Sequence, residues 1–520
     1  MIENKKNTLP HSPTVAIIGA GLAGLSAGAF LRKAGFATTI FEMHKLPGGQ
    51  CTAWKKRGYT FDGCVHWLMG IKPGDAFYPV WEELGVFRNE RQFVPLERHT
   101  VVRFADGEKV TIYSDYKELK NELLRIAPED ETLINEFIRG IKKATTIKIP
   151  DPDDRTFSGL MGLLRAAPSM ISISRKWGRI SIQEFASKFQ NPRMKRVMLV
   201  MLPSEFAMFT LIFNIAALGT RTGAYPIGGS LPMAKDIEET YLSLGGKIKY
   251  NARVTDIITK AQNDRKERII GLRYEDCNIQ KRDRGLGEKT THEFKADYIL
   301  SAGDGISCVE NLLGGRFHHP LTKKVWESLP LYKPLFYISL GMEGDLGIET
   351  SSEGDTIIFN KPLKVSWGEL HQLVVHSLSF DPTLAPKGHS TANLIMDADF
   401  DHWEKLYEDP VYEKTKSDDS EIILNALEGF YPDLKKRLRV IDIATPMTWV
   451  RFTGVHRGAY EGFQWTPQAL RHRNLPRQLK GLDNFYLCGQ WIHPGGGLPT
   501  AVYSGKNVAR MIIKHHHKSK

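Results

Sequence analysis

Three glycines near the start of the chain form the pattern with the clearest chemistry. Gly19, Gly21 and Gly24 follow a β-branched run at 15–18 and open a helical pattern over 22–34. In this spacing the first glycine permits a tight turn, the second lets the backbone approach a pyrophosphate, and the third packs the helix against the strand. The N–H groups at the start of the helix attract phosphate because they have no partner within the helix. The pattern therefore predicts a dinucleotide site.

A carboxylate stands where such a site needs one. A second predicted strand, 38–41, ends at Glu42. A carboxylate at this position accepts hydrogen bonds from ribose hydroxyls. The glycine spacing alone is weak evidence. A strand before it, a helix after it and an acid at the end of the next strand make the prediction of dinucleotide binding specific.

A second glycine-rich segment lies at the other end of the chain. Gly489 follows a predicted strand at 482–488, and the loop 495–497 precedes a helix predicted over 500–513. Two such segments at opposite ends of the chain favour FAD over NAD, because both ends can then fold onto one long cofactor. The start of the second helix would bring its positive dipole end to the flavin ring. The residues predicted to bind FAD are Gly19, Gly21, Leu22, Ala23, Gly24, Glu42, Gly48, Gly49, Gln50, Val254, Gly303, Gly489, Gln490, Gly497, Leu498 and Thr500.

These segments resemble a known family. The chain resembles the phytoene desaturase, carotenoid isomerase and retinol saturase flavoproteins, which belong to the amine oxidase-like superfamily. The resemblance lies in GAGLAGL, the acid that follows it, LPGGQ and the C-terminal CGQWIHPGGGLPTAVYSGKNVA. Residues 225–229 resemble the PxGG loop of that family, and 246–254 resemble its adenosine-binding strand. Residues 445–460 resemble a segment of the isomerase and saturase branch. The desaturase pattern has small residues before His493, where this chain has QWI at 490–492.

The resemblance implies an FAD-dependent oxidoreductase that acts on carbon–carbon double bonds of a long apolar lipid of the carotenoid, retinoid or isoprenoid kind. The reaction would be desaturation, saturation or isomerisation. Two alternatives stay open: an amine-oxidase-like flavoenzyme with a polar substrate, and a non-catalytic prenyl-lipid escort protein of the same fold. The sequence leaves open the direction of the redox chemistry, the electron acceptor, the exact lipid and the oligomeric state.

Three side chains are candidate catalytic residues. His66 and His493 lie beside cofactor-type glycines, where each has either an acid–base role or a structural one. Glu205 interrupts the apolar stretch 197–218. Burial would raise the pKa of this carboxyl and make it a proton donor at a double bond, whereas a helix-start position would leave it exposed. Arg451 is either close to the substrate or part of an ordinary salt bridge.

The segment that contains Glu205 bears on membrane contact. The stretch 197–218 is long enough for a membrane-spanning helix, but Pro203 and the nearby carboxylate favour two helices, buried in a core or lining a lipid tunnel. Upstream, the cluster 175–179 (RKWGR) combines cations with Trp177. This composition is typical of a peripheral membrane surface, with the tryptophan at the interface, and equally of a solvated helix end.

Composition narrows the class of protein. The chain of 520 residues carries a formal net charge of +11, which suits anionic headgroups, nucleic acid or simple solubility. The cations are dispersed and no nucleic-acid-binding motif is present, so we expect no nucleic-acid partner. The five cysteines include no CxxC pair, so neither a disulfide framework nor a metal site is indicated. With no secretory signal pattern in 1–13, we expect a cytoplasmic protein, associated with the inner face of a membrane if it contacts one.

The elements that must position these residues indicate an α/β fold. We expect a Rossmann-type FAD-binding domain with an inserted substrate domain of antiparallel sheet plus helices. The inserted helices include a predicted pair at 116–145. The charged stretch 259–295 predicts a hairpin, and the alternation of apolar and polar residues at 335–400 predicts the antiparallel sheet. The predicted parts are 1–115, 226–310 and 471–520 for the FAD-binding domain, 116–225 for the helical substrate and membrane-contact region, and 311–470 for the substrate-domain sheet.

Overall fold

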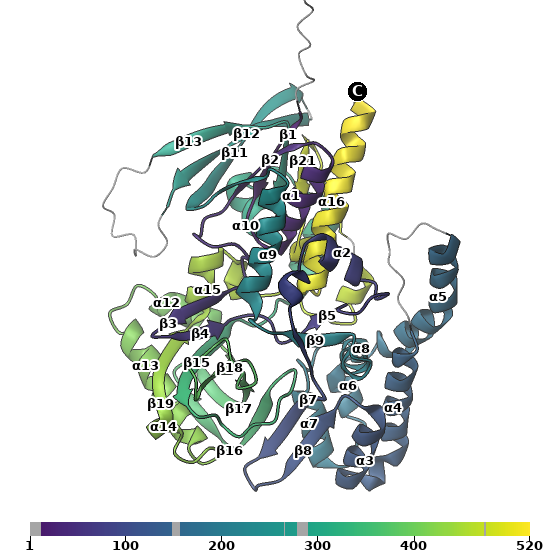
Figure 1. The fold of residues 1–520 in the computed structure, drawn as a ribbon, viewed down its shortest axis with the longest axis vertical. Coiled ribbons are helices and arrows are strands. Elements are labelled where there is room, and N and C mark those ends of the chain that lie inside the picture. Colours follow the sequence, from purple (N-terminus) through teal and green to yellow (C-terminus); the bar gives the residue numbers. More distant parts are fainter. Residues whose placement is uncertain (1–11, 148–156, 265, 278–289, 473–474, 520) are drawn as a thin grey trace, which may run out of the picture.

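A five-stranded parallel sheet forms one half of the molecule (Figure 1). The computed structural model describes residues 12–147, 157–264, 266–277, 290–472 and 475–519. The strand order is β10-β2-β1-β14-β21, and every neighbouring pair is parallel. The strands are β1 (Thr14–Ile18), β2 (Ala37–Phe41), β10 (Lys247–Lys249), β14 (Tyr298–Ser301) and β21 (Phe485–Leu487). The start, the middle and the end of the chain therefore share one sheet, which confirms the Rossmann-type domain.

Helices cover this sheet because its strands are apolar on both faces. β14 and β21 are buried throughout. Helix α1 (Leu22–Lys33) packs against α16 (Leu498–Ser519) and α9 (Ser230–Ser243). The Ser26 hydroxyl donates to the Val502 carbonyl at 2.8 Å, and a Cβ on Gly505 would lie only 2.2 Å from the Ala23 carbonyl oxygen. Small residues thus let the first and last helices of the domain approach closely.

A seven-stranded sheet forms the second half, in the order β19-β15-β18-β17-β16-β7-β8. All its neighbours are antiparallel except β16 and β7. This confirms the predicted antiparallel sheet. The boundary predicted at 115 is wrong, however, because β7 and β8 lie within 1–115 and belong to this second sheet. The strands are β7 (Arg98–Phe104), β8 (Lys109–Tyr113), β15 (Leu335–Glu343), β16 (Asp355–Val365), β17 (Gly368–Ser377), β18 (His389–Asp397) and β19 (Leu438–Ala444).

A bundle of helices between β8 and β9 has its own apolar core. The predicted pair at 116–145 is α3 and α4. The apolar stretch 197–218 falls on two helices, α7 and α8, separated around Pro203, as the proline predicted. No helix within the described part of the chain is long and apolar enough to cross a bilayer. The bundle consists of α3 (Tyr116–Ile126), α4 (Glu131–Thr145), α5 (Phe157–Trp177), α6 (Ile182–Ala186), α7 (Pro192–Val200) and α8 (Met208–Gly219).

Smaller elements join the two halves. The charged stretch after β10 is an antiparallel hairpin, β11 (Ala252–Asn263) and β12 (Lys266–Asp276), as predicted. A three-stranded sheet, β5-β9-β6, lies between the two large sheets (Figure 1).

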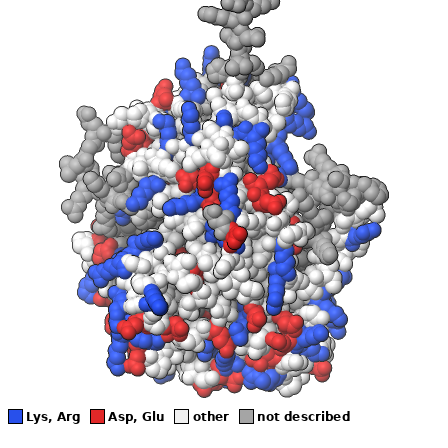
Figure 2. All heavy atoms as spheres, viewed as in Figure 1, with Lys and Arg blue, Asp and Glu red and all other residues white. Residues whose placement is uncertain are grey.

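On the face of the molecule shown in Figure 2, lysine and arginine side chains are interspersed with acidic side chains. The remaining elements are β3 (Ala53–Lys56), β4 (Tyr59–Asp62), β5 (Leu68–Met69), α2 (Tyr78–Glu83), β6 (Phe93–Pro95), β9 (Gly223–Pro226), β13 (Thr291–Lys295), α10 (Gly305–Ser307), α11 (Pro320–Ser328), α12 (Phe400–Leu406), α13 (Tyr412–Leu427), α14 (Leu434–Arg437), α15 (Pro446–Thr453) and β20 (Leu482–Asp483).

Candidate functional site

The turn between β1 and α1 has the backbone that the three glycines predict. Gly19 has φ +97°, a left-handed conformation that favours glycine, and its N–H donates to the Phe41 carbonyl at 2.8 Å. A Cβ on Gly24 would lie 2.1 Å from the Gly19 carbonyl oxygen, so only glycine allows this helix to sit so close to the turn. Gly21 is the N-cap of α1 and supplies no side-chain cap. The start of the helix is therefore suited to an anion.

Glu42 holds this turn against the end of β2. It is 6% exposed, and its two oxygens accept from the N–H groups of Ala20 at 2.7 Å and His44 at 2.8 Å. Burial raises the pKa of this carboxyl, and the backbone hydrogen bonds oppose that shift. Each carboxylate oxygen has a second lone pair, so both are able to accept from hydroxyl groups as well. The Ala252 N–H donates to the Glu42 carbonyl at 2.8 Å, which brings the start of β11, and with it Val254, to this site.

The segment 48–50 lies directly beside the turn. The Gly48 N–H donates to the Ala20 carbonyl at 2.8 Å, and Gly21 and Gly48 form an isolated parallel bridge. Gly48 and Gly49 have φ of +107° and +61°. A Cβ on Gly49 would lie 3.2 Å from the Cα of Gly21. The LPGGQ segment therefore closes over the glycine turn.

The C-terminal glycines meet the same turn from the other side. A Cβ on Gly489 would lie 3.8 Å from the Cβ of Ala23, and one on Gly19 would lie 3.4 Å from the N–H nitrogen of Gly303. Gly489 itself has φ +98° and donates to the Ser504 hydroxyl at 2.8 Å. A Cβ on Gly497 meets nothing within 4 Å, and α16 begins at the next residue. The structure thus brings the predicted glycines from both ends of the chain to one place.

Two of the sequence hypotheses rest on burial patterns that the structure contradicts. Glu205 is exposed in the turn between α7 and α8, so its premise as a buried proton donor is wrong. Trp177 is 2% exposed and packs edge-on against Phe185 at 5.4 Å between ring centroids, so it is not a membrane-interface residue. For Trp177, the neighbouring residues in sequence gave no information about which side of the helix faces the core, and for Glu205 the apolar stretch concealed a turn.

The two candidate histidines have different partners. Arg477 donates to Nε2 of His493 at 3.0 Å, because a guanidinium cannot accept. His66 Nδ1 lies 3.3 Å from Glu353 Oε2, and both side chains are partly accessible, at 29% and 23%. The Glu353 Oε1 atom accepts from the indole N–H of Trp67 at 3.2 Å. His66 therefore pairs with a carboxylate, whereas His493 accepts from a guanidinium.

The pair belongs to a larger cluster of ionisable groups. The rings of His66 and His376 lie 4.3 Å apart between centroids, and the buried ring of His99 approaches Glu353 closely enough for their charges to interact. Burial lowers the pKa of both His99 and His376. Burial alone would raise the pKa of Glu353, but the hydrogen bond and charge of His66 hold it at about 2. The hydrogen bond and the negative charge of Glu353 raise the pKa of His66 against the effect of burial, so the pair favours the ionised form of both partners.

Glu461 is the second carboxyl of the cluster. Burial raises its pKa to about 7, a hydrogen bond from Tyr332 opposes the shift, and the negative charge of Glu353 adds to it. A Cβ on Gly496 would lie 3.0 Å from the Cβ of Glu461, so this residue packs directly against the C-terminal glycine loop. Sequence reasoning missed Glu461, Glu353 and His376. Their partners are hundreds of residues away, and no local spacing connects them.

The sequence model of the flavin containing amine oxidoreductases matches residues 22–513. The chain belongs to this family. A phytoene desaturase (neurosporene-forming) of Rhodobacter capsulatus is 26% identical, over 95% of this chain and 93% of that protein. Prolycopene isomerase 1 of an Oncidium hybrid cultivar is 21% identical over 95% and 83%. The all-trans-retinol 13,14-reductase of Danio rerio is 24% identical over 93% and 83%.

A solved structure supports the fold. An oxidoreductase from Methanosarcina mazei superimposes with a TM-score of 0.58 at 16% identity, and the match covers 96% of this chain and 100% of the other. The family resemblance read from the glycine motifs is confirmed. The chain is a flavin-dependent oxidoreductase, and its family implies a flavin cofactor.

Proposed function

We propose that the flavin is FAD and that the enzyme acts on carbon–carbon double bonds of a long, apolar polyene or isoprenoid lipid, by desaturation, saturation or isomerisation. The observation that carries the substrate class is the near full-length similarity to three enzymes whose names specify phytoene, prolycopene and retinol. The reactions in these names differ, but each one changes double bonds in a conjugated or isoprenoid chain.

The residues at the glycine site fit FAD. The start of α1 would bind the pyrophosphate, because Gly21 leaves its N–H groups without a side-chain cap. Glu42 would accept the ribose hydroxyls, and Val254 would pack beside the adenosine. The start of α16, after Gly497, would direct its N–H groups at the isoalloxazine ring. FAD bound here supplies hydride transfer to or from carbon, while the protein orients the lipid and excludes water.

The experiment begins with the cofactor. Purified protein is denatured, and the released flavin is identified by chromatography against FAD and FMN. The holoprotein is then incubated with a panel of polyenes and retinoids in vesicles, with a polyamine as the comparison substrate, and products are identified by mass. FAD together with a polyene product two hydrogens lighter, two hydrogens heavier or isomeric supports the proposal. Turnover of the polyamine alone overturns it.

We further propose that the protein is cytoplasmic and that it meets the inner face of a membrane through α5. Leu164 and Ile171 of this helix are 58% and 49% exposed. Figure 1 shows α5 at the margin of the helical bundle, with one end projecting beyond it. An exposed apolar helix face of this kind suits the acyl boundary of a bilayer.

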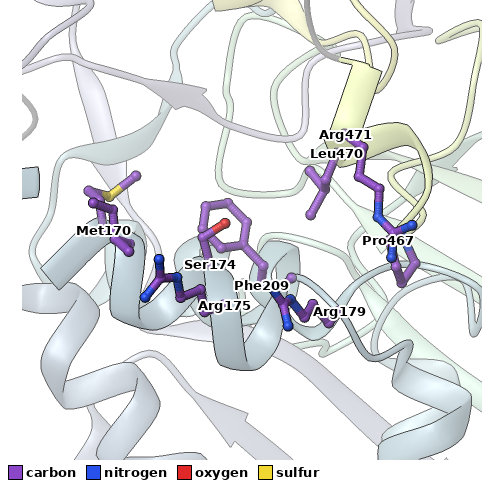
Figure 3. A pocket seen from close by; sticks show the side chains of 10 residues that line it. Met170, Ser174, Arg175, Arg179, Phe209, Pro467, Leu470 and Arg471 are labelled. Carbon is purple, nitrogen blue, oxygen red and sulfur yellow. The ribbon is translucent and has the colours of Figure 1, made fainter. Parts of the chain in front are cut away.

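A cationic groove lies beside the C-terminal half of α5. Its volume is about 450 Å³, and three arginines surround it, Arg175 and Arg179 on the α5 side and Arg471 on the other (Figure 3). None of the three has an ion pair with a carboxylate in the described residues. Pro467 lines this groove, and Trp465, close to it in the sequence, packs against Gly495 of the C-terminal glycine loop.

Vesicle binding tests this second proposal. Replacing the three arginines with serine should release the protein from vesicles that contain anionic lipid at low salt. A control variant with Lys323, Lys414 and Lys436 replaced by serine loses the same charge from exposed positions elsewhere. If both variants bind alike, the groove is not the docking site.

A further inference from the structure

The segment 461–465 is fixed against the loop that opens α16. A Cβ on Gly495 would lie 2.3 Å from the ring of Trp465, and one on Gly496 would lie 2.6 Å from the Glu461 carbonyl oxygen. On the other side, the Tyr332 N–H donates to the Gly462 carbonyl at 2.8 Å. Glycine at 495 and 496 is therefore required for Glu461 to stand this close to the start of the helix.

Glu461 faces a set of ionisable groups from several elements. They are His66 and Cys64 from the turn after β4, Glu353 from the turn before β16, Tyr332 from the turn before β15, and the neighbouring Tyr460. His99 of β7 and His376 of β17 stand behind the Glu353–His66 pair. Within the described residues, Glu461 is the one carboxyl of this set without a cation bonded to it.

This arrangement separates the roles of the two carboxyls. Glu353 is ionised at neutral pH, and the adjacent His66 favours the cationic form that offsets its charge. Glu461 has a hydroxyl donor in place of a cation, so it exchanges its proton near neutral pH. A neutral carboxylic acid is also far cheaper than a carboxylate to place beside an apolar polyene.

We propose that Glu461 is the residue that transfers a proton to or from the carbon–carbon double bond, and that Glu353 and His66 are positioning residues that set its charge. This inference rests on the proposed function, because it assigns the proton step of that reaction.

The step balances in both directions. In saturation, the O–H bond of Glu461 would break and a C–H bond would form at one carbon of the double bond as the π bond is lost, which leaves the Glu461 carboxylate. In desaturation, the Glu461 carboxylate would take the proton as a C–H bond breaks and the π bond forms. Bound FAD would supply or accept the hydride at the neighbouring carbon, and a two-electron donor of the quinol or nicotinamide class, or an acceptor of the quinone or oxygen class, would restore it.

The first test measures the acid itself, without substrate. Infrared difference spectra of the flavin-loaded protein are recorded across neutral pH. Burial also raises the pKa of Asp355, to about 6, so the test uses the wild-type spectrum minus that of the variant, in which carboxyls common to both proteins cancel. For Glu461→Gln this subtraction should leave a protonated-carboxyl C=O band that titrates near neutral pH. For the matched control Glu205→Gln, an exposed carboxyl, it should leave no such band. The absence of the band for Glu461→Gln, or its presence for the control, overturns the assignment. Because no lipid is added, this test does not depend on the proposed substrate.

The second test uses the polyene reaction. Glu461→Gln should keep its flavin content and lose about 10²–10⁴-fold in turnover, the usual contribution of a general acid or base. Wild-type turnover in this variant overturns the proposal. If neither the wild type nor the variant turns over any polyene, the proposed function fails. The infrared result still shows whether Glu461 is the carboxyl that titrates near neutral pH.

The positioning residues give shifts of opposite sign. Removing the cation in His66→Asn should move the pH inflection of turnover upward, because Glu353 then acts on Glu461 without compensation. Removing the anion in Glu353→Gln should move it downward. A merely structural role changes turnover without moving the inflection. Unchanged inflections in two folded, flavin-containing variants therefore contradict the positioning role.

Discussion

Replacing Glu461 with glutamine should change how the stability of the protein depends on pH. The folded pKa of about 7 lies above the ordinary value of 4.5. A group with a raised folded pKa contributes stability below its unfolded pKa and loses it as pH rises through the folded pKa. The full loss over the shift of about 2.5 pH units is about 3 kcal/mol, at 1.36 kcal/mol per unit. Glutamine does not titrate, so the variant has no such loss.

The effect is measurable as a melting temperature. Between about pH 5 and pH 8.5, about 2.5 kcal/mol of the loss is expressed. An unfolding entropy of about 2.1 cal/mol/K per residue gives about 1.1 kcal/mol/K for 520 residues. The melting temperature of Glu461→Gln minus that of the wild type should therefore increase by about 2 °C as the pH rises over this range. Both proteins are melted in parallel by calorimetry, so that other titrating groups cancel, with Glu205→Gln as the control. A difference that is flat with pH, or of opposite sign, refutes the reasoning.

Three further changes test other parts of the structure. Glu42→Ala should weaken flavin binding by about 10–100-fold, because hydrogen bonds to a charged acceptor contribute about 1.5–3 kcal/mol, and a flavin titration measures this. Gly24→Ala forces a Cβ to within 2.1 Å of the Gly19 carbonyl oxygen and should cost about 1–3 kcal/mol of unfolding free energy, whereas the exposed Gly429→Ala should not. Trp177→Ala should cost about 3–5 kcal/mol by denaturant unfolding, and a cost below 1 kcal/mol would contradict its burial.

The glycine site was predictable because its determinants are local. The spacing of Gly19, Gly21 and Gly24 fixes a turn and a helix start within six residues, and Glu42 follows on the next strand. Local pattern also placed the break in the apolar stretch at Pro203, where a helix loses a hydrogen bond. The glycines at 495–497 marked the second half of the site in the same way.

Other features depend on long-range packing and left no local signal. His66 and Glu353 are 287 residues apart in the sequence, and the position of Glu353 depends on the long-range pairing of β16 with β7, where its N–H donates to the His99 carbonyl at 2.8 Å. Trp177 looked like an interface residue because cations flank it, yet Phe185 and the rest of the bundle cover its ring. The boundary after residue 115 was misplaced for a related reason, since β7 and β8 pair with strands that come much later in the chain.

The most direct test of the proposed enzyme is a single turnover without oxygen. The purified flavin-loaded protein is mixed anaerobically with a polyene in vesicles, once with oxidised flavin and once after chemical reduction, and the flavin absorbance is followed. The account predicts that the polyene bleaches the oxidised flavin or reoxidises the reduced one, or that it is isomerised with the flavin still bound. A flavin that responds to an amine and to no polyene, with no polyene product, would contradict it.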